Sequence, residues 1–203
     1  SVVAPEHSSP VDDASLIKSF FSTLPPVNVQ SGLVSIAVVV AAAWAWYSAV
    51  NVLEVICWFV FFCGLIILAV VDYKTKLLPD VLTLPLLWLG LVIQLLPETR
   101  TVGLDASVLG VVAGYLPLWL LAQVYRTVRG RDGLGMGDLK LLAAMGAWSG
   151  PLLLPQVLLL AVLLALAVFL IERVIHRHAS GFHEERPFGP AIVAAYFLVL
   201  IVT

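Results

Sequence analysis

The chain of 203 residues is 61% hydrophobic and only 12% charged, with a mean hydropathy of +1.04 and a formal net charge of −2. This composition excludes an ordinary water-soluble domain and indicates an all-α, polytopic membrane protein. Each span needs roughly 20 apolar residues, so the length allows six or seven spans and no large soluble domain. The sequence has no basic face or nucleic-acid-binding module, so no nucleic-acid partner is expected.

The first 30 residues are predicted to form a tail on the membrane surface. Residues 1–14 are polar, whereas residues 15–24 carry apolar side chains at helical spacing and predict a short amphipathic helix. Pro25 and Pro26 end that helix. The expected organisation is therefore a tail, 1–30, and a transmembrane domain, 31–203.

Hydropathy predicts about seven spans, of which the fifth holds only about a dozen residues and could instead be re-entrant. The spans are 32–50, 53–72, 81–96, 105–125, 138–150, 152–172 and 188–203. If all seven cross, ten of the eleven basic residues lie on one side, with Arg100 alone on the other. This asymmetry predicts that the N-terminus and the basic side are cytoplasmic.

Most polar residues have ordinary explanations. Cys57 and Cys63 are six residues apart within an apolar run, which fits no disulfide framework or zinc site and predicts a packing role. No metal and no cofactor are expected. Three acids, Asp72, Asp80 and Asp138, remain because each falls at the cytoplasmic end of a predicted span.

The three acids differ in their local environments. Asp72 ends a helix, where the dipole is negative and nothing local favours its ionised form. Asp138 begins a helix, where free N–H groups favour the anion, so the alternative role for it is an N-cap. Asp80 follows Pro79 and precedes a helix, so capping is the main interpretation, with a supporting role in a site left open.

Asp72 and Asp138 are expected to enter the membrane at the same depth from the same side. Two carboxylates a few ångströms apart cannot both ionise, so the pair shares one proton. One can then act as general base on a water while the other polarises a peptide carbonyl. Three glycines, Gly133, Gly135 and Gly137, precede Asp138 and would permit positive φ angles and close approach of a substrate backbone.

Two other interpretations of this segment are weaker. Lys140 is two residues beyond Asp138 and points away from it on a helix, so it is expected to be a membrane-surface anchor. The glycines do not have dinucleotide-binding spacing, and no strand precedes them.

These residues resemble a known family. Residues 135–138 match the GxGD motif of intramembrane aspartyl proteases, and 70–91, 135–148 and the PFGP of 187–190 resemble type IV prepilin peptidases. The resemblance implies that Asp72 and Asp138 are catalytic. It further implies cleavage of the leader peptide of type IV prepilins or type II secretion pseudopilins, after a glycine, at the cytoplasmic face of the bacterial inner membrane.

Bifunctional members of that family also carry a domain with two CxxC pairs, associated with N-methylation. This sequence has no CxxC, which favours a peptidase-only form. Two alternatives remain open. One is a GxGD protease acting on other membrane helices or signal peptides, and the other is a non-enzymatic transporter or scaffold whose acids bind ions or relay protons.

Overall fold

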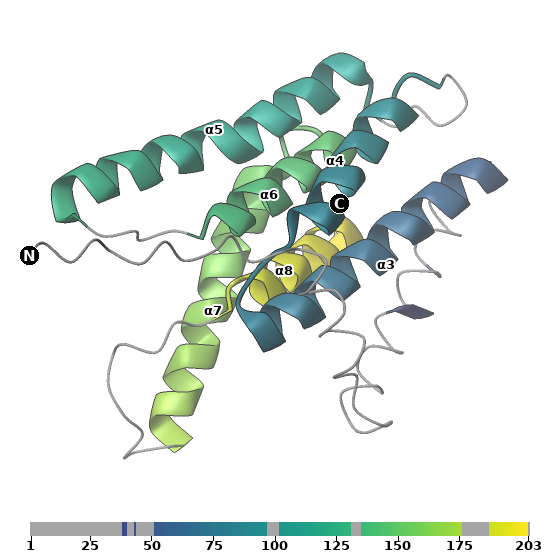
Figure 1. The fold of residues 1–203 in the computed structure, drawn as a ribbon. Helices are drawn as coiled ribbons and strands as arrows, with labels where there is room; N and C mark the ends of the chain where they lie inside the picture. Colours follow the sequence, from purple (N-terminus) through teal and green to yellow (C-terminus); the bar gives the residue numbers. More distant parts are fainter. Residues whose placement is uncertain are drawn as a thin grey trace, which may run out of the picture.

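The structure is a computed structural model that describes residues 38, 39, 43, 51–96, 102–130, 135–175 and 187–202. This part of the chain is helical and contains no strand (Figure 1). Its helices are α3 (Val52–Thr75), α4 (Asp80–Ile93), α5 (Leu104–Arg129), α6 (Met136–Ser149), α7 (Leu154–Ile175) and α8 (Gly189–Val202). The all-helical fold class is thereby confirmed for the described residues.

Each of the last six predicted spans corresponds to one of these helices, with ends that differ by a few residues. Of the first predicted span only residues 38, 39 and 43 are described, and all three are helical. The predicted tail, 1–30, lies outside the described residues, as does Gly133.

Only part of the predicted set is long enough to cross a bilayer. By length and composition, α3, α5 and the Leu154–Ile171 part of α7 are candidate spans. The helices α4, α6 and α8 have 14 residues each, which corresponds to about 21 Å against a hydrocarbon core of about 30 Å. Seven crossings with a cytoplasmic N-terminus therefore stay a prediction.

Helix α6 lies at the centre of the bundle (Figure 1). Every residue from Leu141 to Trp148 is buried, so this helix has no polar face. Its Trp148 ring stacks on Phe61 of α3, with ring centroids 4.3 Å apart, and its indole N–H donates to the Leu86 carbonyl of α4 at 2.9 Å. Phe61 also makes an edge contact with Tyr196 of α8. These contacts hold four helices around one aromatic core.

Small residues let α5 run antiparallel against α6 at backbone distance (Figure 1). The buried residues of α5 are Ser107, Gly110 and Gly114, which share one face. A Cβ at Gly110 would overlap the Gly146 carbonyl, and one at Gly114 would lie 2.6 Å from the Leu142 carbonyl oxygen. Gly110 and Gly114 thus form a GxxxG contact that positions the helix carrying Asp138.

Candidate active site

Asp72 occupies the last turn of α3, and its side chain is buried. The backbone N–H of Gly189, the first residue of α8, donates to its Oδ2 at 2.8 Å. An amide donor at the positive end of a helix stabilises a carboxylate. The expectation concerned local groups only, and the donor that the structure adds comes from a second helix, 117 residues away in sequence.

Within the first turn of α8, the Gly189 N–H is the only backbone donor that reaches Asp72. Pro190 has no N–H, and the N–H groups of Ala191 and Ile192 both donate to the Phe188 carbonyl at 3.1 Å. A Cβ on Gly189 would stand 2.7 Å from the same Asp72 oxygen. Any side chain at this position would therefore displace the carboxylate from its donor.

Gly189 is a site residue to which the sequence argument gave no role. The signal was present in PFGP, because a Gly-Pro pair at the start of a helix leaves a free N–H without a side chain beside it. What the pattern lacked was any indication of which acid that N–H would reach.

Asp138 is the third residue of α6, and the N-cap residue is Gly135. Because Gly135 is the N-cap, the N-cap alternative for Asp138 is wrong, although the prediction that it lies at a helix start is confirmed. Its carboxyl group is partly buried and accepts no hydrogen bond from the described part of the chain. The two acids are thus unequal, because one has a fixed donor and the other does not.

The two described glycines of GxGD provide space, but they do not adopt positive φ angles. Gly135 has φ −66°, and neither it nor Gly137 is among the glycines with positive φ. A Cβ at Gly135 would lie 2.9 Å from Asp138 Oδ2, and one at Gly137 would lie 2.7 Å from the Leu78 Cβ. The glycines therefore make room for the Asp138 carboxyl and for Leu78 of the Leu78-Pro79-Asp80 segment, which is called the LPD segment below.

The register of α3 against α6 places both aspartates at one end of the bundle. Asp72 lies eleven residues after Phe61, and Asp138 lies ten residues before Trp148, the partner of Phe61 in the ring stack. At about 1.5 Å per residue, Asp72 lies about 16 Å along α3 from Phe61, and Asp138 lies about 15 Å along α6 from Trp148. The two helices are antiparallel. Both aspartates therefore lie at the same end of the two helices, and the predicted catalytic pairing of these acids stays a prediction.

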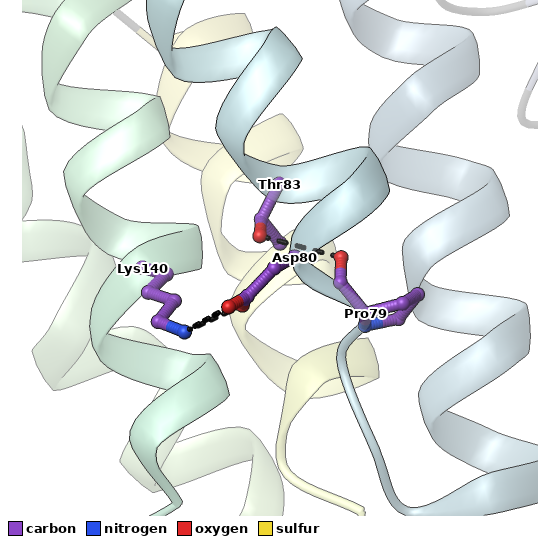
Figure 2. A network of polar contacts seen from close by, with 4 residues as sticks. All are labelled: Pro79, Asp80, Thr83 and Lys140. Atoms are coloured by element: carbon purple, nitrogen blue, oxygen red, sulfur yellow. Dashed lines mark hydrogen bonds and ion pairs between the residues drawn. The ribbon is translucent and has the colours of Figure 1, made fainter. Parts of the chain in front are cut away.

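Asp80 and Lys140 form an ion pair between α4 and α6 (Figure 2). Pro79 is the N-cap residue of α4 and Asp80 is the first helical residue, so the capping role predicted for Asp80 is wrong. Its two carboxylate oxygens instead lie 2.5 and 2.7 Å from the Lys140 Nζ. Lys140 thus has a protein partner, and its role as a membrane-surface anchor stays a prediction. It ties the LPD segment to the helix that carries Asp138.

The described residues contain no group of three or more His, Cys, Asp or Glu side chains that could hold a metal ion. Cys57 and Cys63 are free and partly buried on α3, and Cys57 packs against the hydrophobic core.

Comparison with known proteins gives consistent results. A family model described as the type IV leader peptidase family matches residues 59–170, a range that includes both aspartates. Three similar proteins carry the name prepilin leader peptidase/N-methyltransferase. The one from Dickeya chrysanthemi is 47% identical over 135 residues, covering 66% of this chain and 46% of the relative. The one from Burkholderia pseudomallei (strain K96243) is 45% identical over 131 residues, covering 64% and 41%.

The third, from Aeromonas hydrophila, is 38% identical over 179 residues, covering 87% of this chain and 57% of the relative. The chain thus spans roughly half the length of the curated relatives that it matches. No solved structure matches it.

Proposed function

This chain belongs to the type IV leader peptidase family, and on that premise we propose that it is an intramembrane aspartic endopeptidase. Its substrates would be type IV prepilins or type II secretion pseudopilins, from which it removes the leader peptide. The observation that carries the proposal is the position of Asp72 and Asp138 at the same end of the bundle, on antiparallel helices joined by the Phe61–Trp148 ring stack.

The proposed reaction uses the carboxyl pair and one water. The ionised aspartate takes a proton from the water, whose oxygen attacks the scissile carbonyl carbon, while the protonated aspartate donates a hydrogen bond to the carbonyl oxygen. The tetrahedral intermediate then collapses, the C–N bond breaks, and the leaving amine receives the proton that the base aspartate took from the water. The active-site loop around Gly135 and Gly137 would place the substrate backbone, with Asp80 in a supporting role.

The proposed location of the site is the cytoplasmic face of the bacterial inner membrane. The ten-to-one distribution of basic residues supports this orientation if all seven segments cross. Cleavage at that depth suits a substrate whose leader is soluble and whose following segment is an apolar helix. The lipid bilayer and the prepilin are therefore the proposed partners, and no cofactor is needed.

We propose the peptidase reaction alone for these residues. The relatives are named for both a peptidase and an N-methyltransferase, and the chain matches about half of their length. The sequence contains no CxxC pair.

The proposal is tested by incubating the purified chain in detergent with a prepilin and, separately, with a signal-peptide remnant. Mass spectrometry of the products identifies the bond that is cut. The expected result is a single cut in the prepilin after the glycine that precedes its apolar helix, with the remnant left intact. Cleavage of the remnant alone would instead support a protease acting on other membrane helices.

A further inference from the structure

We infer that the two aspartates have fixed and different roles: Asp72 is the ionised base that activates water, Asp138 is the proton donor, and Gly189 is the positioning residue that sets this order. The inference rests on the proposed function and deepens it, because the proposed function leaves open which aspartate does what.

The first argument is the hydrogen bond from Gly189 to Asp72. An N–H can only donate, so it stabilises a carboxylate acceptor and gives nothing comparable to a protonated O–H on the same oxygen. The remaining first-turn N–H groups of α8 are already used or missing, so Gly189 alone brings the positive end of this helix to Asp72. The hydrogen bond also fixes one oxygen and leaves the other for water.

The second argument is the environment of Asp138. Its carboxyl group is partly buried, lies at the same end of the bundle as Asp72, and accepts no hydrogen bond from the described residues. Its place in the first turn of α6 favours the anion through the helix dipole, but α6 directs no N–H at this carboxyl. A pair that shares one proton therefore keeps it on Asp138.

The charged groups of α3, α4 and α8 do not reverse this order. On the element that carries Asp72, Lys74, Lys76 and Tyr73 are exposed, whereas the Asp72 side chain is buried. From α4 the nearest acid is Asp80, which is neutralised by Lys140 of α6. Between residues 189 and 202, the only titratable side chain of α8 is Tyr196, which is buried in the aromatic core.

The test is the pH profile of kcat/KM for prepilin cleavage by wild type and Gly189→Ala. The added Cβ displaces Asp72 from its donor, so the anion becomes harder to form and the acid limb moves to higher pH. Loss of a hydrogen bond to a charged group should move the acid limb by about one to two pH units. At pH values above the acid limb, kcat/KM of Gly189→Ala is expected to stay within about tenfold of wild type. Tenfold is the factor that corresponds to one pH unit.

The matched control is Gly64→Ala, whose three nearest neighbours would all be side-chain atoms of Leu86 rather than backbone or acidic groups. Gly64→Ala should leave the acid and alkaline limbs of the kcat/KM profile at the same pH values as in wild type. Movement of the alkaline limb in Gly189→Ala, or a uniform loss at every pH, would overturn the assignment.

A second measurement does not depend on the folding of the Gly189 variant. Asn at 138 keeps an N–H that can donate to the substrate carbonyl while Asp72 remains as base, whereas Asn at 72 leaves no base. Asp138→Asn should therefore retain at least about tenfold more residual activity than Asp72→Asn, since a positioned general base contributes roughly 10² to 10⁴ in rate. Equal or reversed residual rates would overturn the assignment. If both variants cleaved at the wild-type rate, the proposed function itself would fail.

Discussion

Two glycines at the site act by having no side chain. Gly189 leaves space for the Asp72 carboxylate at its donor, and Gly135 leaves space for the Asp138 carboxyl. Because neither has a positive φ in this structure, alanine is conformationally permitted at both positions. Substitution there should therefore change the chemistry of the site more than the stability of the fold.

Gly135→Ala is expected to reduce prepilin cleavage at least about tenfold, because the new Cβ would lie 2.9 Å from Asp138 Oδ2 and must move it. The melting temperature should change little, because residue 135 is exposed. Cleavage assays paired with thermal unfolding of the same preparation check both statements. Cleavage at the wild-type rate would show that the space beside Asp138 is not needed.

The Asp80–Lys140 pair allows a charge-exchange test. The two side chains are 44% and 28% exposed, so their contribution to stability should be at most about 1 kcal/mol. If the Asp80–Lys140 ion pair supports the site by holding the LPD segment against α6, Asp80→Asn and Lys140→Met should each lower kcat several-fold. The exchanged variant Asp80→Lys/Lys140→Asp should then recover part of the loss, as a double-mutant cycle on kcat would show. Failure of the exchange to recover any activity would count against a positioning role for the pair.

At the scale of elements, α6 shows why a short segment can carry a site. Its fourteen residues are too few to cross the hydrocarbon core as a lone helix, yet they pack against α4 and α5 and meet α3 through the Phe61–Trp148 ring stack. Asp138 consequently stands on a helix held by protein on several sides, as a precisely placed acid requires. The close contact with α5 through Gly110 and Gly114 is the largest part of that support.

Gly114→Leu is expected to separate α5 from α6, because its Cβ would meet backbone atoms of Leu142 that cannot turn aside. Overpacking of this kind costs about 1 to 3 kcal/mol or more. Thermal unfolding in detergent should show a clear decrease in melting temperature, accompanied by loss of cleavage. The control Val112→Leu lies on an exposed part of the same helix and should unfold like wild type. Equal melting temperatures for all three proteins would contradict a packing role for Gly114.

The sequence alone predicted where the helices lie and that Asp72 and Asp138 fall at helix ends. Both predictions depend on local patterns. Apolar runs locate helices, and an acid at the end of such a run is rare enough to be noticed. It did not predict the partners of those acids. Gly189 reaches Asp72 across 117 residues, and Lys140 reaches Asp80 across 60. Which segments meet depends on how α8 and α4 pack, and no local pattern encodes that.

At the scale of the whole molecule, the helices divide into an inner and an outer group. In the most apolar 18-residue stretch of α3, 44% of the residues are buried. In the corresponding stretches of α5 and α7, only 17% of the residues are buried. The outer helices therefore expose apolar side chains, which suits contact with lipid. The site lies at one end of the inner group, where a water-soluble leader and a membrane helix could both be accommodated.

A carboxyl pair that shares one proton should give the intact enzyme a bell-shaped pH profile. Below the acid limb the anion is protonated and no base remains, and above the alkaline limb the proton donor is ionised. The measurement is kcat/KM for prepilin cleavage across pH in detergent. A rate that rises monotonically through the acid range would be inconsistent with a pair working in this way.

The most direct test of the carboxyl pair is prepilin cleavage by Asp72→Asn and by Asp138→Asn, each purified and shown to unfold at a temperature close to wild type. Replacing either acid removes the base or the proton donor, so both rates should fall by at least about 10². Mass spectrometry should find uncut prepilin where wild type has released the leader. Release of the leader at the wild-type rate by either variant would show that the pair is not the catalytic site.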